Sequence, residues 1–343
     1  MQGKVLLGSP AGFRGLGARG AAYLPTTARS AIVFSVCLIL LWTLCIWRAS
    51  PGLGCLEVGS RPEVNLCEAK SCFVADHQSS ANATSAFRLP HIAPNIFQVF
   101  LSDESECGGI GDMTLSWIAR SPSYTYTMLR SAVAQEAVAR LAASEARYHN
   151  APGVYNSMTR LVMRADFVRY LFLALEGGFY GDTDTELIQP PHMWATNQTH
   201  KAAAKLIVGI EGDASPPERG MKYEVQFSQW AMAGAKDHPV LWAMVDRILQ
   251  QVPGKTEFTD ADVLDVSGPR GWTEIIFAHL SRQAGSEIGW RDLHGLREPR
   301  LIGDTLVLPI DGFGTGLHHS RASREINRNT MVIHHFQGSW RQG

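Results

Sequence analysis

Apolar residues recur at helical spacing between residues 161 and 175, and this stretch is followed by two glycines and a short aromatic segment. The apolar positions that share the spacing are Leu161, Val168, Leu171, Phe172 and Leu175. The periodicity predicts a helix, and Gly177 and Gly178 are predicted to end it because a left-handed residue is needed there. Phe179 and Tyr180 then predict a short strand.

Two acidic residues, Asp182 and Asp184, follow this strand in a predicted loop. Residues i and i+2 of an extended segment point the same way, so both carboxylates are expected to face one point. Two such oxygen donors suit Mg²⁺ or Mn²⁺ that also holds a diphosphate. An isolated Asp-x-Asp is a weak signal, and a solvated loop is the alternative. The position after a helix, a glycine turn and an aromatic strand favours the metal site.

Asp166 and Arg169 are charged residues inside the apolar helix, at positions i and i+3. One interpretation is a surface ion pair of a few tenths of a kcal/mol, about the value for such pairs on helices. The helix is strongly apolar and leads directly to the predicted metal loop. A contact with a ligand is therefore the favoured interpretation.

Alternating helix and strand patterns continue on both sides of this stretch. Strands are predicted at 96–100, 205–211, 306–311 and 331–340, with amphipathic helices at 128–147 and from Pro239 onward. A turn is predicted at 267–273 and a flexible glycine loop at 312–316. His238, which precedes Pro239, is interpreted as structural. This alternation predicts an α/β fold with a mixed sheet.

The amino-terminal part has a different composition. Residues 1–30 contain Gly, Ala and basic residues, and residues 31–47 form an uncharged apolar run of 17 residues bracketed by Arg29 and Arg48. We predict a cytosolic tail at 1–30, a transmembrane signal-anchor at 31–48, a lumenal stem at 49–88 and a catalytic domain at 89–343. A cleaved signal peptide and a buried helix are the alternatives.

Composition places few other limits on function. The chain has 343 residues, 45% hydrophobic and 18% charged, with a formal net charge of −1, which gives no indication of a nucleic-acid partner. Cysteines predicted to be lumenal are Cys55, Cys67, Cys72 and Cys107. Their number is even, which suits disulfides in an oxidising compartment, but four cysteines allow three pairings and the sequence does not choose among them.

Several segments carry a resemblance to one family. The pattern R-A-D-F-V-R-Y-L-x-L-x-x-x-G-G-x-Y-x-D-x-D, from Arg164 to Asp184, resembles the signature of glycosyltransferase family 32 and, within it, the fungal initiation-specific α-1,6-mannosyltransferases. Segments at 91–100, 226–239, 267–273 and 306–316 also resemble family segments, and together they cover most of 89–343. In the first of them Gln98 is retained, whereas Asn95 and Phe97 depart from the family's Lys and His.

The resemblance implies a GT-A-type nucleotide-sugar-binding mixed sheet flanked by helices. It also implies a Golgi (cis), type II enzyme that moves mannose from GDP-mannose to an N-glycan, with retention at the anomeric carbon. Asp182 and Asp184 would hold Mn²⁺ (or Mg²⁺), with His335 as third ligand and His334 as alternate; a core histidine is the competing interpretation. Residues implied in donor binding are Asp166, Arg169, Gln98, Gly268 and Arg270. Asp166 and Arg169 would contact the nucleoside or position the Asp-x-Asp loop. For Gly268 and Arg270, an ordinary glycine turn is the alternative interpretation.

Glu211, at the end of a β-branched run, is implied near the acceptor or donor sugar. A solvated strand end is the alternative for this residue. The resemblance leaves no nucleophile or catalytic base identified.

Three other functions are alternatives to this mannosyl transfer. A phosphatase of the Asp-x-Asp-x-Thr/Val type requires Thr or Val four residues after the first Asp, where this chain has Glu186. A non-catalytic subunit in a complex with other mannosyltransferases is a second alternative. Within the family, extension of mannan or transfer to inositol phosphoceramide is a third.

Overall fold

The computed structural model describes residues 89–101, 111–317 and 321–337. The chain divides into two units, Met1–Leu56 and Glu57–Gly343, and the described residues all lie in the second. The predicted membrane span and stem, and the four cysteines, therefore lie outside the described residues. Among the helices of the described part, none has the length and apolarity needed to cross a bilayer.

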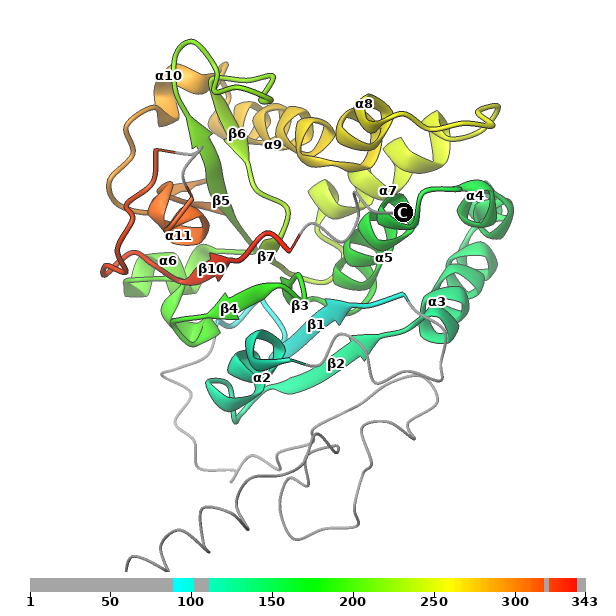
Figure 1. Cartoon of the computed structure of the whole chain (residues 1–343), viewed down its shortest axis with the longest axis horizontal. Helices are drawn as coiled ribbons and strands as arrows, with labels where there is room; N and C mark the ends of the chain where they lie inside the picture. The colour runs from blue at the N-terminus through cyan, green and yellow to red at the C-terminus, as the bar shows by residue number, and fades with distance from the viewer. Residues whose placement is uncertain (1–88, 102–110, 318–320, 338–343) are drawn as a thin grey trace, which may run out of the picture. The chain divides into compact units, whose positions relative to one another are not determined.

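A mixed sheet forms the centre of the described residues, as the alternating pattern predicts (Figure 1). Its strand order is β2-β1-β3-β7-β5-β9-β8, with β6 paired to β5. The strands are β1 (Asn95–Val99), β2 (Thr125–Leu129), β3 (Gly178–Gly181), β5 (Leu206–Asp213), β6 (Val225–Phe227), β7 (Ala231–Gly234), β8 (Arg300–Ile302) and β9 (Thr305–Leu308). Strands β1, β2, β3, β5 and β9 run in one direction, and β6, β7 and β8 run in the other.

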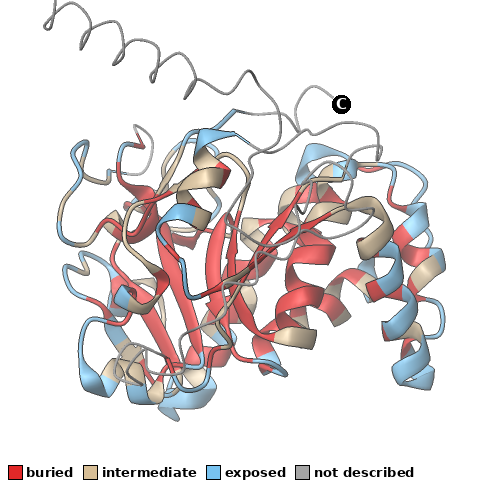
Figure 2. Cartoon of the chain, turned by 90° about the horizontal axis from the view of Figure 1, so that it is seen from below, coloured by how far each residue is buried: buried red, intermediate tan, exposed pale blue. Residues whose placement is uncertain are grey.

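Alternate residues of each strand enter two separate cores because side chains alternate across a sheet. Phe97 and Tyr180 lie in the core shared with helices on one face, and their neighbours Ile96 and Phe179 lie in the core on the other face. The helices of the first face are α3 (Ser131–Ser144), α4 (Ala151–Ser157), α5 (Leu161–Glu176), α7 (Pro239–Gln251) and α9 (Pro269–Ala284). The central strands are therefore almost entirely buried (Figure 2).

The second face carries shorter elements. Helices α2 (Asp112–Ala119) and α11 (Asp311–Gly314) lie there with a separate two-stranded sheet, β4 (Thr185–Leu187) paired antiparallel with β10 (Val332–His334). The remaining short helices are α6 (Gln198–Ala203), α8 (Asp260–Asp262), α10 (Trp290–Leu293), η2 (Ala146–Tyr148), η3 (Pro191–Met193) and the π-helical η4 (Val263–Ser267). Pairing of β4 with β10 brings the carboxy-terminal segment to the Asp-x-Asp loop.

The central helix and its glycine stop are as predicted, with one difference. Helix α5 ends at Gly177, whose φ of 66° is left-handed, and a Cβ there would lie 2.6 Å from the backbone nitrogen of Lys236. Leu161 is exposed, however, whereas all residues from Asp166 to Ala174 are buried. The helix is therefore buried on nearly all sides, because the sheet and α7 both pack against it.

Four predicted boundaries were wrong. Met128 belongs to β2, and the helix that follows starts only at Ser131. The predicted turn at 267–273 is the junction of η4 with α9, and the predicted loop at 312–316 contains the buried helix α11. The last strand spans only Val332–His334. In each case hydrogen bonds to distant segments or to the preceding turn decide the backbone, and local propensity does not report these.

Candidate functional site

The Asp-x-Asp segment forms a tight turn between β3 and β4. The Thr185 N–H donates to the Asp182 carbonyl at 3.0 Å, and the Asp182 N–H donates to the carbonyl of Trp230 at 2.8 Å. The prediction that an extended segment aligns the two carboxylates was therefore wrong, because this turn brings them together. Gly181 precedes the turn, and a Cβ there would lie 2.2 Å from the ring of Trp117, whose indole N–H donates to Thr185.

His334 completes a group of three potential metal ligands with Asp182 and Asp184. One ligand atom from each residue lies within 4.8 Å of the others. His334 Nε2 lies 3.1 Å from Asp184 Oδ1, and the Gln337 N–H donates to Asp184 Oδ2 at 3.1 Å. His335 is the ligand that the sequence favours. Its side chain does not contact the two aspartates but pairs with Glu186 at 3.1 Å. The alternate, His334, is thus the histidine that the structure brings to the two aspartates.

A buried ion-pair network holds Asp182 from the side of α5. Arg169 Nη2 lies 3.0 Å from Asp166 Oδ1 and 3.1 Å from Asp182 Oδ1. Asp166 is fully buried and also accepts a hydrogen bond from Ser267 Oγ at 2.7 Å. The Tyr180 hydroxyl donates to Asp182 Oδ1. Asp166 and Arg169 are therefore neither a surface pair nor open to solvent, and their polar contacts position Asp182.

The pKa values of the three aspartates of this group are shifted in different directions. Burial raises the pKa of Asp166 to about 6, against the opposing charge of Arg169. Burial also raises the pKa of Asp182, and Asp184 adds to this while Arg169 opposes it. Burial favours a higher pKa for Asp184 too, but the hydrogen bond and charge of His334 outweigh it and hold that pKa below its usual value. When all are ionised, three carboxylates face one guanidinium, which is a suitable environment for a divalent cation.

Gln98 supports the same turn from strand β1. Its side chain is fully buried, its amide donates to the Asp182 carbonyl at 2.9 Å, and its own carbonyl accepts from the Tyr126 hydroxyl at 2.7 Å. Both ends of the side chain are thus engaged within the protein. The structure gives Gln98 a role in fixing the Asp-x-Asp turn, in place of the donor contact implied by the resemblance.

Gly268 and Arg270 lie at the start of α9, and their contacts are internal. The Gly268 N–H donates to the carbonyl of Val263 at 2.8 Å, and a Cβ on Gly268 would lie 2.7 Å from that carbonyl oxygen. Arg270 Nη1 lies 3.6 Å from Asp265, and its Nη2 donates to the Gly220 carbonyl. The glycine is therefore required by close packing within the η4–α9 junction, and its N–H is not available to a ligand. The site connects to this junction through Ser267 and Asp166.

Glu211 lies in β5, which runs parallel to β3, so both strands point toward the edge of the sheet that carries the Asp-x-Asp turn. Its carboxylate is buried and accepts a hydrogen bond from Gln226 Nε2 at 3.0 Å. Burial raises the pKa of Glu211 to about 7, and the nearby His334 acts in the opposite direction. This burial excludes the alternative interpretation of Glu211 as a solvated strand end.

Several known proteins are similar in sequence to this chain. Residues 111–201 match the glycosyltransferase sugar-binding region containing a DXD motif. The chain is 33% identical over 235 residues to the initiation-specific alpha-1,6-mannosyltransferase of Schizosaccharomyces pombe, which covers 66% of this chain and 59% of that protein. Residues 111–201 of this chain are thus similar to a glycosyltransferase sugar-binding region that contains a DXD motif, and Asp182 and Asp184 lie within them.

Other relatives have lower sequence identity to this chain. The initiation-specific alpha-1,6-mannosyltransferase of Candida albicans is 27% identical over 259 residues, covering 66% of this chain and 65% of that protein. The chain thus spans less than two thirds of the length of either of these relatives. Among solved structures, the PaToxG glycosyltransferase matches 57% of this chain and 72% of its own at 13% identity, with a TM-score of 0.38.

Several residues that build this site were not predicted from the sequence. Tyr180 and Trp230 contact Asp182 directly, and the side chains of Gln229 and Ser267 reach Asp166, at 3.4 Å in the case of Gln229. Gln229 and its neighbour Trp230 could have been recognised from the polar residues that interrupt the apolar segment 226–235, because buried polar side chains require partners.

We expect Glu211→Gln to change the pH dependence of the protein's stability. The pKa of Glu211 is raised from an ordinary 4.5 to about 7, so the folded state holds this proton more tightly than the unfolded state. This stabilisation is complete below pH 4.5 and is lost as pH rises through about 7, at a cost of about 2 to 3 kcal/mol. Urea denaturation at several pH values should show Glu211→Gln more stable than wild type at pH 8, but not at pH 4.5. The exposed Glu257→Gln serves as control, and equal pH profiles of Glu211→Gln and wild type would contradict the assignment.

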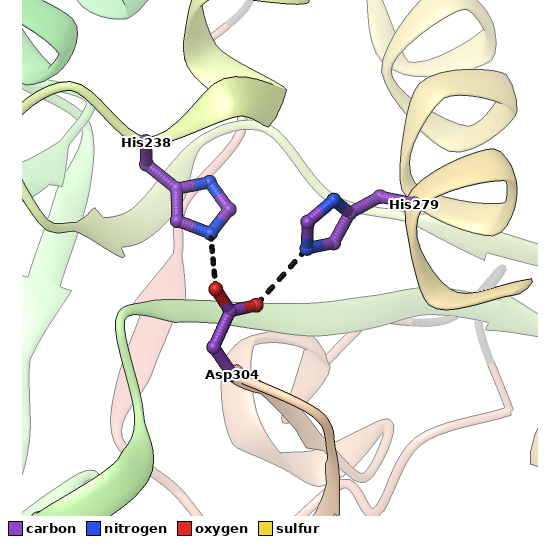
Figure 3. Close-up of side chains that lie close together, drawn as sticks. All are labelled: His238, His279 and Asp304. Carbon is purple, nitrogen blue, oxygen red and sulfur yellow. Dashed lines mark hydrogen bonds and ion pairs between the residues drawn. The ribbon is translucent and has the colours of Figure 1, made fainter. Parts of the chain in front are cut away.

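A second group of ligand-type side chains lies elsewhere in the protein, where His238 and His279 point toward Asp304 from two sides (Figure 3). His279 Nε2 lies 3.0 Å and His238 Nε2 3.5 Å from the Asp304 carboxylate. The Val240 N–H donates to His238 Nδ1, so the hydrogen of a neutral His238 ring is on Nε2 and faces Asp304. The hydrogen bond of His279 and the ion-pair contact of His238 with Asp304 link α7, α9 and the β8–β9 turn. The structural role of His238 stays a prediction.

Asp304→Asn is expected to lower the free energy of unfolding by about 1.5 to 3 kcal/mol, the range for hydrogen bonds to a charged group. Burial favours a higher pKa for Asp304, but the hydrogen bonds of His238 and His279 outweigh it and lower that pKa. The stabilisation is therefore present above the unfolded pKa and is lost as the solution is acidified. Thermal and urea denaturation check this. A rise in Tm on adding Zn²⁺ that Asp304→Asn abolishes would instead identify a metal site.

Proposed function

We propose that this chain transfers mannose from GDP-mannose to a mannose residue of an N-glycan, forming an α-1,6 linkage with retention at the anomeric carbon. The observation that carries the proposal is the convergence of Asp182, Asp184 and His334 at the end of β3, inside the matched DXD region. Both reported relatives are named initiation-specific alpha-1,6-mannosyltransferases, which supports the choice of donor and linkage. We further propose that the mixed sheet is a GT-A-type nucleotide-sugar-binding fold, since ligands of α/β sheets bind at the carboxyl ends of parallel strands.

A divalent cation, Mn²⁺ or Mg²⁺, fits the side chains of this site. Asp182, Asp184 and His334 would hold it, and the excess of negative charge described above would be neutralised. His334 Nδ1 is buried without a hydrogen-bond partner among the described residues, and Nε2 is the ring nitrogen that faces Asp184, at 3.1 Å. Nε2 would therefore be the ligand atom. When bound, the cation would supply positive charge that offsets the negative charge on the departing GDP.

The residues around the aspartates have positioning roles in this proposal. Arg169 holds Asp182 in one orientation through their ion pair, and Gln98 holds the backbone of the same residue. The Gln337 N–H and His334 engage the two oxygens of Asp184. Because these contacts come from separate segments, the two carboxylates are ordered before a donor arrives, which reduces the cost of binding it.

We also propose that the enzyme is a single-pass type II protein of the cis-Golgi membrane, with its catalytic domain in the lumen. Support comes from the apolar run at 31–47, bracketed by Arg29 and Arg48. The alternatives are a mannan chain or inositol phosphoceramide as the acceptor, or membership in a complex of mannosyltransferases. The experiment below distinguishes them from transfer to an N-glycan.

The test is an assay of the full chain, purified in mild detergent, with Mn²⁺, GDP-mannose and a high-mannose N-glycan, and with products read by mass and linkage analysis. One added α-1,6-mannose, abolished by a chelator, is the expected result. Release of GDP without glycan extension would retain the donor and move the acceptor to mannan or a lipid. No turnover with any acceptor would overturn the catalytic proposal in favour of a non-catalytic subunit.

A further inference from the structure

The segment from His334, the last residue of β10, to Gln337 makes three contacts with Asp184. His334 Nε2 approaches Asp184 Oδ1 at 3.1 Å, the His335 N–H donates to the Asp184 carbonyl at 2.9 Å, and the Gln337 N–H donates to Asp184 Oδ2 at 3.1 Å. Phe336 is the residue of this segment between the second and third contacts. The backbone on both sides of Phe336 is therefore held by the Asp-x-Asp turn.

Phe336 has a backbone conformation that is unfavourable for its type. Its φ is 46°, in the left-handed region, where a residue with a Cβ costs about 1 to 2 kcal/mol relative to the right-handed form. Such conformations persist where the surroundings impose them, and they concentrate at ligand-binding sites. Here the contacts of His335 and Gln337 with Asp184 impose the conformation.

The ring of Phe336 lies at the exposed end of an aromatic cluster. Its centroid is 3.7 Å from that of His334 and 5.4 Å from that of Trp230, and the rings of Trp230 and His334 stack on each other at 4.7 Å. Trp230 is buried and its indole N–H donates to the Phe313 carbonyl. Phe336 itself remains 42% exposed. The strain thus maintains an apolar ring at the surface, in contact with a candidate metal ligand.

We propose that Phe336 binds the acceptor, by stacking its exposed ring against the apolar face of a hexopyranose. A pyranose ring carries C–H groups on its faces and hydroxyl groups at its edge, so a rigid aromatic ring beside polar groups suits it. The acceptor is favoured over the donor because the donor diphosphate would occupy the cation site at Asp182 and Asp184, which are less exposed than Phe336. This inference rests on the proposed glycosyl transfer.

Phe336→Leu and Phe336→Trp form a matched pair for the test, since leucine removes the flat ring and tryptophan keeps one. Steady-state assays of the full chain would use Mn²⁺, GDP-mannose and a high-mannose oligosaccharide. We expect Phe336→Leu to raise the acceptor KM by about five- to tenfold, the effect of an aromatic contact, and Phe336→Trp to stay within about twofold of wild type. The KM for GDP-mannose and the Mn²⁺ activation constant should not change. Leu161→Ala, which also truncates an exposed apolar side chain, should match wild type.

A second variant and a second readout cover failure of folding or of turnover. Phe336→Gly removes the ring at a position where glycine is unstrained, so a folded protein is expected even if Phe336→Leu is unstable. Calorimetric titration of the oligosaccharide into wild type and variant, with Mn²⁺ and GDP present, measures binding without catalysis. Weaker binding by Phe336→Gly supports the inference even if wild type shows no transfer, an outcome that would overturn only the proposed function. Equal affinities, no oligosaccharide binding by wild type, or a change confined to the donor KM would each overturn the assignment of Phe336.

Discussion

Asp182→Asn is expected to lower kcat for mannosyl transfer by about a thousandfold or more, with the fold retained. Asparagine keeps a side-chain oxygen for the Tyr180 hydroxyl but removes the negative charge that a divalent cation and Arg169 face. Loss of one charged ligand weakens the cation that stabilises the departing diphosphate, and electrostatic contributions of this kind are among the largest in catalysis. Turnover with GDP-mannose and calorimetric titration of GDP with and without Mn²⁺ would measure both effects.

Two comparisons make this result specific. Asp260→Asn removes an exposed carboxylate whose ion-pair partner is Arg160, and it should leave kcat unchanged. Circular dichroism and Tm should show that Asp182→Asn is folded, because Arg169 keeps its ion pair with Asp166. An Asp182→Asn enzyme with near wild-type kcat would eliminate the assignment of Asp182 to a metal site.

Arg169→Met is expected to lower the free energy of unfolding by about 3 to 5 kcal/mol, the range for removing one partner of a buried ion pair. Arg169 is 4% exposed and pairs with both Asp166 and Asp182. Burial alone would lower the pKa of Arg169, but Asp182 and the other acidic neighbours outweigh it and raise that pKa, so the guanidinium stays charged. Its removal leaves a fully buried carboxylate at Asp166 without a counter-charge. Urea denaturation followed by tryptophan fluorescence would measure the loss.

The contribution of the buried charge can be separated with a double variant. Asp166→Asn combined with Arg169→Met should recover at least about 1 kcal/mol relative to Arg169→Met alone, because the unpaired buried charge is then gone. The surface pair of Arg140 with Glu176 supplies the control, and Arg140→Met should cost less than about 0.5 kcal/mol. If Arg169→Met were no more destabilising than Arg140→Met, the network would have no structural importance.

The organisation of the site explains why local patterns predicted its centre well. Helix α5, its glycine end and strand β3 depend on apolar spacing and on the left-handed backbone at Gly177, which are properties of neighbouring residues. The same holds for β5 and for the start of α7 at Pro239. Asp182 and Asp184 could therefore be placed at a strand end before any tertiary contact was known.

Other features could not be predicted because they depend on pairing between distant segments. The choice between His334 and His335 is decided by the register in which His334 pairs with Thr185. A shift of one residue would exchange the two histidines, since neighbouring strand residues face opposite sides. The resemblance implied that Gln98 contacts the donor. The parallel pairing of β1 with β3 instead places its side chain within hydrogen-bond distance of the Asp182 carbonyl.

The sequence by itself determined an α/β chain with an Asp-x-Asp loop after a buried helix, and it identified the family through ordered motifs. The helix, its glycine end and the loop follow from periodicity, glycine conformations and residue spacing, all of which act over a few residues. The family resemblance rests on matching residues in the ordered motifs. Only the tertiary structure decided that a tight turn brings the carboxylates together, that Asp166 and Arg169 are buried supports of that turn, and that Phe336 presents an exposed ring beside His334. The physical reason is that these arrangements depend on strand register and on hydrogen bonds between segments more than 60 residues apart, such as Gln229 with Asp166 and Gln337 with Asp184.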